Sequence, residues 1–165
     1  GILFWSSVVF SPHDESTSLT TVIGRNGGDG IDTAGDGIHI AAPIVFVGNT
    51  TINGYSQLNA GIFVYGSSVV FPDNVKLIGT GESFGILAVT DIHFSGNADV
   101  NGAGCMGIGL TNSRLNLEGS PTQTVRFSGE SNSTFPVAPS NCNYVSGIYF
   151  NGTNIVGNQP LELDG

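Results

Sequence analysis

The sequence predicts an all-β chain that folds as a right-handed, single-stranded parallel β-helix of about six repeat units. Helical periodicity is nearly absent, and short β-branched runs alternate with Gly, Asn and Pro. The chain also repeats itself, with three landmarks in a fixed order. A three-strand unit of about 22–24 residues cannot bury its apolar positions alone. Stacked units can, because equivalent residues then form continuous columns.

The landmarks place one strand each within every repeat unit. The first is a Gly-Ile pair, at Gly1, Gly37, Gly61, Gly85, Gly107 and Gly147, with intervals of 36, 24, 24, 22 and 40 residues. The second is an apolar residue two positions before Phe or Leu: Val8/Phe10, Ile44/Phe46, Val69/Phe71, Ile92/Phe94 and Leu115/Leu117. The third is an apolar residue two before Gly: Val22/Gly24, Ile52/Gly54, Leu77/Gly79, Val100/Gly102 and Phe127/Gly129. Alternate residues of each strand point inward and outward.

The length of 165 residues suits one domain, residues 1–165. Loop insertions near 11–19, 25–36, 118–124 and 130–146 account for the two long intervals. Gly1 begins in register with the later Gly-Ile pairs and without a signal peptide, so we expect a processed chain or one cut from a longer protein. The terminal units then pair end to end with another copy or continue into further chain.

The charge composition excludes several classes of protein. Four Lys and Arg residues against 13 Asp and Glu residues give a net charge of -9. Because phosphate contacts need clustered cations and these four are scattered, we expect no nucleic-acid binding. No apolar run approaches the roughly 20 residues that span a bilayer, so no membrane span is expected.

An Asn follows each of three Phe residues by three positions, in the motifs FVGN, FPDN and FSGN. Their side chains, Asn49, Asn74 and Asn97, sit at turns and can bond to the units above and below, which predicts an Asn ladder. With the approximate GGA-I partners Asn59-Ala60-Gly61-Ile62 and Gly102-Ala103-Gly104, residues 37–110 resemble the polymorphic outer-membrane protein family. The resemblance implies a surface-exposed, adhesive β-helix passenger.

The expected architecture also resembles that of the pectin-lyase-like enzymes. Their chemistry needs paired carboxylates, or an acidic calcium cluster beside a basic residue. The sequence has neither set, and Lys76, aligned between Thr51 and Asp99, fits an ordinary surface ion pair. We therefore expect no enzyme activity and no cofactor. A carbohydrate-binding or carbohydrate-cleaving β-helix is the alternative function.

Two further motifs have competing interpretations. Residues 27–32 match the GGxGxD core of calcium-binding repeats, so Asp29, Asp32 and Asp36 are candidate calcium ligands. The motif occurs in one copy, which favours a loop of turn-forming residues. Cys105 and Cys142 precede Gly-Ile pairs in successive units, which favours a disulfide over two buried thiols.

Three Asn-x-Ser/Thr motifs are candidate glycosylation sites, at Asn49, Asn132 and Asn151. Asn132 lies in a predicted loop and is the best acceptor of the three. Together with the disulfide, these motifs fit an extracellular or cell-surface location.

The outward residues of the first strands form an unusual apolar stripe. A contiguous apolar surface marks an interface or a ligand groove. We expect contacts with protein subunits, with a glycan groove as the alternative. The sequence thus predicts a structural or adhesive module, such as a filament or surface-layer subunit or an adhesin, that assembles by axial or lateral packing. The stripe comprises Leu3, Trp5, His39, Phe63, Tyr65, Leu87, Val89 and Tyr149.

Overall fold

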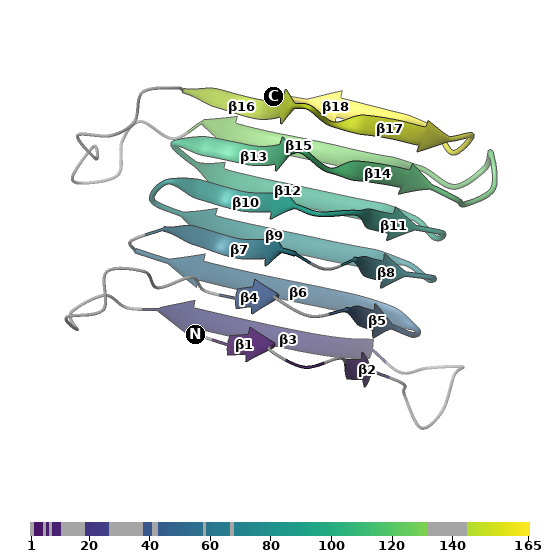
Figure 1. Cartoon of the computed structure of the whole chain (residues 1–165), viewed down its shortest axis with the longest axis horizontal. Helices are drawn as coiled ribbons and strands as arrows, with labels where there is room; N and C mark the ends of the chain where they lie inside the picture. The colour runs from purple at the N-terminus through teal and green to yellow at the C-terminus, as the bar shows by residue number, and fades with distance from the viewer. Residues whose placement is uncertain are drawn as a thin grey trace.

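The computed structural model describes residues 2–4, 6, 8–10, 19–26, 38–40, 43–57, 59–66, 68–131 and 145–165. These residues form eighteen β-strands and no helix. The strands make three parallel, six-stranded sheets (Figure 1). The chain passes through the three sheets in the same order six times, so each repeat unit contributes one strand to each sheet. The predicted all-β, parallel architecture is confirmed.

The first sheet contains the strands that follow the Gly-Ile landmark. Its register aligns the isoleucines of all six pairs, from Ile2 opposite Ile38 to Ile108 opposite Ile148, as the repeat predicts. In spatial order, its strands are β1 (Ile2–Phe4), β4 (Ile38–Ile40), β7 (Ala60–Tyr65), β10 (Phe84–Val89), β13 (Met106–Thr111) and β16 (Ser146–Asn151).

The second sheet contains the shortest strands and a stack of phenyl rings. Ring centroids lie 4.9 Å apart for Phe10 and Phe46, 5.3 Å for Phe46 and Phe71, and 5.4 Å for Phe71 and Phe94. These spacings approach the strand separation, because one ring stands on each strand. In chain order, the strands are β2 (Val8–Phe10), β5 (Ile44–Phe46), β8 (Val69–Phe71), β11 (Ile92–Phe94), β14 (Arg114–Leu117) and β17 (Asn154–Gly157).

The third sheet contains the longest strands, which extend beyond the boundaries expected from sequence. Arg25 pairs with Tyr55, and Glu130 with Ala103, inside two segments predicted as loops. The partner strands continue there and offer backbone groups, so the hydrogen-bond ladder continues too. The strands are β3 (Leu19–Asn26), β6 (Asn49–Ser56), β9 (Val75–Gly81), β12 (Ala98–Gly104), β15 (Val125–Ser131) and β18 (Leu161–Asp164).

Glycines join the third sheet to the first at a row of close backbone contacts. A Cβ atom at Gly102 would collide with the carbonyl group of Gly107, and the same geometry recurs in neighbouring units. A carbonyl group within a strand cannot swing aside, so these positions accept no side chain. This explains why both landmarks carry Gly. We call the pairs Gly54/Gly61, Gly79/Gly85, Gly102/Gly107 and Gly129/Gly147 the glycine seam.

The inward side chains of all three sheets pack into one hydrophobic cluster. Ile62, Phe94 and Phe127 are each 1% exposed and represent the three sheets. The space left between the core side chains is about 20 Å³ and its lining is apolar. Such a space has room for no more than a water molecule. A ligand must therefore bind on the outside of the described structure.

Candidate binding surfaces

The outer face of the first sheet carries the predicted stripe. Register places Phe63 and Leu87 side by side, and both are half-buried. Tyr65, which pairs with Val89, is 54% exposed, and its ring lies 5.9 Å from that of Phe63. Leu3 and Tyr149, at 58% and 36% exposed, stand in the first and sixth units. Trp5 and the side chain of His39 lie outside the described residues.

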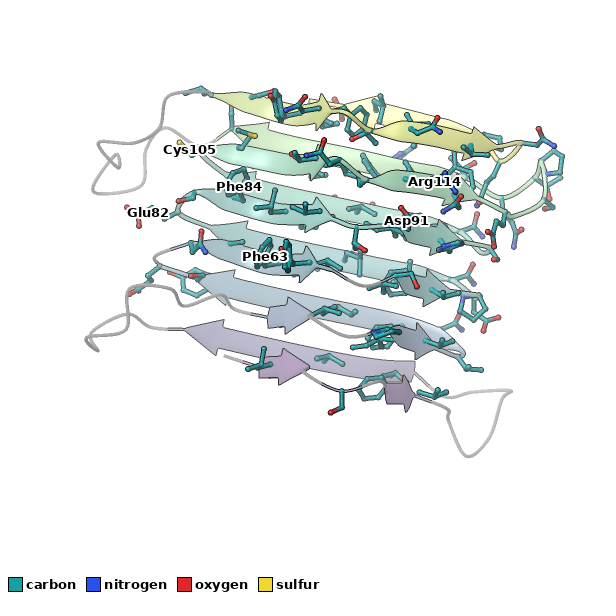
Figure 2. The ribbon with its side chains drawn as sticks, viewed as in Figure 1. Phe63, Glu82, Phe84, Asp91, Cys105 and Arg114 are labelled. Atoms are coloured by element: carbon teal, nitrogen blue, oxygen red, sulfur yellow. The ribbon has the colours of Figure 1, made fainter. Side chains whose placement is uncertain are left out.

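Gly109 interrupts this row, but neighbouring apolar side chains reach toward it. A Cβ atom at Gly109 would lie 3.3 Å from Cδ1 of Leu87 and 3.4 Å from Cδ1 of Phe84. Phe84, at the start of β10 (Figure 2), therefore extends the apolar surface although the sequence analysis did not include it. Phe84 lies two positions before Ile86, so strand alternation groups it with the inward residues and gave no signal for the outer face. We call Leu3, Phe63, Tyr65, Phe84, Leu87, Val89 and Tyr149 the apolar face.

The outer face of the third sheet carries charges instead. Lys76, Asp99, Arg126 and Glu162 occupy one register position in four successive units, and we call them the charge column. Lys76 Nζ lies 3.9 Å from Asp99 Oδ2, which confirms the predicted ion pair. Arg126 donates from Nε and Nη2 to Glu162 Oε2 at 2.8 and 2.6 Å. This hydrogen bond, followed by the charge of Glu162, raises the pKa of Arg126.

The Asn ladder is present at the turn before the third sheet. Asn74 Nδ2 donates to Asn49 Oδ1 at 3.1 Å, and Asn97 Nδ2 donates to Asn74 Oδ1 at 3.0 Å. Each side-chain oxygen also serves the next unit: the backbone N–H of Asn97 donates to Asn74 Oδ1, and that of Thr124 to Asn97 Oδ1, both at 3.0 Å. The ladder lines a shallow groove together with Lys76 of the charge column. Its main role is to join successive turns.

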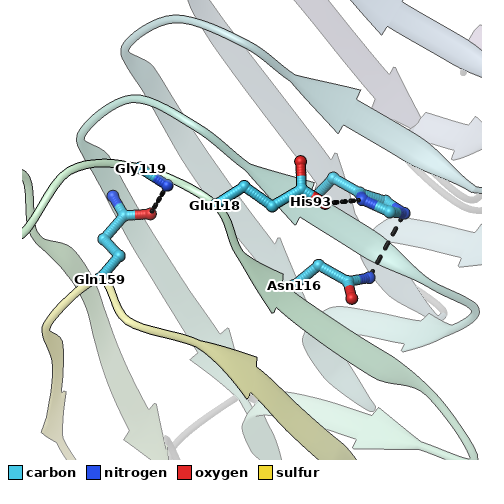
Figure 3. Close-up of polar contacts among 5 residues, drawn as sticks. All are labelled: His93, Asn116, Glu118, Gly119 and Gln159. Atoms are coloured by element: carbon cyan, nitrogen blue, oxygen red, sulfur yellow. Dashed lines mark hydrogen bonds and ion pairs between the residues drawn. The ribbon is translucent and has the colours of Figure 1, made fainter.

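The second sheet contributes a polar cluster around His93 (Figure 3). His93 Nδ1 lies 2.8 Å from Glu118 Oε1, and Nε2 lies 3.3 Å from Asn116 Nδ2. A carboxylate only accepts hydrogen bonds, so Nδ1 donates and, in the neutral ring, Nε2 accepts from Asn116. Both ring nitrogens are therefore engaged. The cluster joins neighbouring strands, and its geometry assigns no catalytic role to His93.

Gln159 is a buried connection that the sequence analysis missed. Its side chain is 4% exposed, and Oε1 accepts from the backbone N–H of Gly119 at 3.1 Å (Figure 3). Its Nε2 donates to the carbonyl oxygen of Gly96 at 2.6 Å. Gly96, Gly119 and Gln159 lie in the turns before β12, β15 and β18, so this side chain links three successive units.

Several predicted sites lie outside the described residues: Asp29, Asp32, Asp36, Asn132 and Cys142. Cys105 is buried at the turn between β12 and β13 (Figure 2), and its disulfide with Cys142 stays a prediction. Asn49 and Asn151 are exposed. Among the described residues, no group of three or more His, Cys, Asp or Glu side chains is placed to hold a metal ion.

Comparison with known proteins gives a uniform result. No protein-family model, curated protein or solved structure matches the chain. Across the described ranges, the structure also contains no helix with the length and hydropathy needed to cross a bilayer. The function must therefore be inferred from the surfaces themselves.

Proposed function

We propose that the chain is a right-handed parallel β-helix that serves as an extracellular structural or adhesive module, and that its apolar face binds other protein subunits. The three parallel sheets, visited in a fixed order, support the β-helix. Crossover connections between parallel strands are right-handed in nearly all proteins, which supports the hand.

The apolar face is the observation that carries the functional proposal. The residues at its two rows, from Phe63 to Tyr149 and from Tyr65 to Asn151, bear no charge. Interface centres are depleted in charge and enriched in aromatic residues, as this face is. Contiguous apolar patches on a chain of this size usually mark a binding surface.

Three sequence features support the extracellular setting. The FxxN motifs resemble those of adhesive passengers, and their Asn residues form the ladder. The predicted disulfide and the glycosylation motifs fit secretion. Calcium binding by Asp29, Asp32 and Asp36, which lie outside the described residues, is an alternative within the same proposal.

Replacing Phe63 and Tyr65 with Ser tests the interface. Both side chains lie on the outer face of β7, so we expect unchanged circular dichroism and association weakened at least about tenfold in sedimentation velocity. The matched control replaces Val45 and Val70 with Ser, because these paired residues face outward on the second sheet. Equal association of the F63S/Y65S variant and the parent chain would remove this face from the proposal.

A glycan-binding function is the second candidate, and the stacked Phe63–Tyr65 pair favours it. The ring of Tyr65 is exposed and stacks on the half-buried ring of Phe63, and such aromatic faces can stack on sugar rings. Calorimetric titration with oligosaccharides, followed by chromatography of the sugars, separates the cases. Binding lost in F63S/Y65S without cleavage supports a glycan adhesin. Cleavage of the sugar would instead identify an enzyme and contradict our proposal.

A further inference from the structure

The few cations of this chain gather on one surface. Arg25, Lys76 and Arg126, three of the four Lys and Arg residues, lie on the outer face of the third sheet. Two of them alternate with acidic residues in the charge column, which runs positive, negative, positive, negative from the third unit to the sixth. The column is neutral as a whole, within a chain of net charge -9.

Because its charges alternate in this order, the column is complementary to a second copy of itself that runs in the opposite direction. We propose that the outer face of the third sheet binds a second copy of the chain in antiparallel orientation, about a two-fold axis between Asp99 and Arg126. Reversed, the column places Lys76 opposite Glu162 of the second copy, and Asp99 opposite Arg126. The two-fold axis repeats both contacts, so four ion pairs form between the copies.

The same charges disfavour the parallel arrangement. Two parallel copies related by a two-fold axis along the strand stack would place Lys76 against Lys76 and Asp99 against Asp99. Like charges in contact oppose association, so the column selects the orientation as well as the partner. The four side chains are 48–61% exposed, which leaves them accessible to a second copy despite their contacts within the chain.

The flanking surface suits a polar interface. The Asn ladder borders the column on one side. In the four overlapping units, the row on the other side contains Ile78, Asn101, Ser128 and Asp164. Amide and hydroxyl groups there can exchange hydrogen bonds between the copies or through water. This surface is separate from the apolar face, so the inference does not depend on the proposed function. If both faces bind copies through two-fold contacts, the contacts alternate and extend an open chain of molecules.

Charge substitutions test the complementarity directly. In the F63S/Y65S background, which weakens the apolar face, K76E/R126E makes the column wholly negative and D99K/E162K makes it wholly positive. We expect each variant alone to lose self-association at least about tenfold relative to the background chain, and an equimolar mixture to regain it. Rising salt, from about 0.05 to 0.5 M, should weaken the background dimer.

A matched control changes the net charge equally but leaves the column intact. Arg25 lies in the first unit, beyond the overlapping third to sixth units, and Arg114 lies on the second sheet. The R25E/R114E variant should therefore associate more strongly than K76E/R126E. Equal loss in the two variants, a background chain that stays monomeric at about 1 mM, or a mixture without recovery would overturn the proposal.

The orientation has its own measurement. Lys76 is the sole Lys of the chain, so a zero-length carbodiimide crosslink at a Lys side chain has one origin. Within one chain, Lys76 and Glu162 are three units apart, about 14 Å, too far for such a link. A crosslink between Lys76 and Glu162 of isotopically distinct copies is expected. Crosslinked dimers in which that pair is missing would exclude the antiparallel arrangement.

Discussion

The outer faces of the first and third sheets cover the same core but present opposite chemistry. Phe63 and Leu87 follow one another on the first sheet, whereas Lys76 and Asp99 do so on the third. Both are six-stranded sheets with one strand from each repeat unit, and both contribute to the glycine seam. The inward positions are thus constrained by packing, while outward positions in the same strands are available for contacts with partners.

The largest expected effect comes from adding one methyl group inside rather than outside. Gly102→Ala forces Cβ into the carbonyl group of Gly107, so we expect destabilisation by more than about 4 kcal/mol or loss of folding. Gly109→Ala adds the same group beside the flexible Leu87 side chain and should change stability by less than about 1 kcal/mol. Urea unfolding followed by circular dichroism compares them. Similar urea midpoints for the two variants would show that the backbone at the glycine seam can shift to accommodate a Cβ atom.

Removing an aromatic side chain should also cost more stability in the core than on the outer face, but the difference should be smaller than for the added methyl group. Phe94 is 1% exposed and stacks on Phe71, so Phe94→Ala should lower the free energy of unfolding by about 3–5 kcal/mol. Tyr65 is 54% exposed, and Tyr65→Ala should cost less than about 1 kcal/mol. The same urea titration measures both. A cost for Tyr65→Ala matching that of Phe94→Ala would mean that the apolar face supports the fold.

Of the three destabilising substitutions, the one in the Asn ladder is expected to have the smallest effect. Asn74→Ala removes the bonds to Asn49 and Asn97 and should cost about 1–2 kcal/mol. Hydrogen exchange of the backbone N–H of Asn97 should accelerate, because this group donates to Asn74 Oδ1. Asn53→Ala, at an exposed site on the same sheet, is the control. An unchanged exchange rate of that N–H group would show that the Asn ladder does not protect it.

Inward positions made the fold predictable from sequence. The isoleucines of the Gly-Ile pairs and the stacked Phe residues recur because each faces a copy of itself in the next unit. Strand ends were less predictable: Arg25 and Glu130 were assigned to loops, but backbone pairing with β6 and β12 holds them in strands. Side-chain identity carries little information about where such pairing stops.

The candidate surfaces were predictable only where they follow strand alternation. Phe63 and Tyr65 appeared on the outer face for that reason. Phe84 was missed because its ring reaches toward Gly109, on the next strand. The charge column was incomplete from sequence because the third landmark was assigned in only five units. Leu163 and Gly165 repeat that landmark in the sixth unit, and register with β15 places Glu162 opposite Arg126.

Gln159 gives the stack a mechanical property. Backbone ladders join each repeat unit only to its neighbours, so tension on the last strand would peel units away one at a time. Gln159 adds a latch, since its amide holds Gly119 in the fifth unit and Gly96 in the fourth. Force applied to β18 is therefore distributed over three units. Detachment of the sixth unit must break the two hydrogen bonds of the Gln159 side chain as well as the backbone ladder.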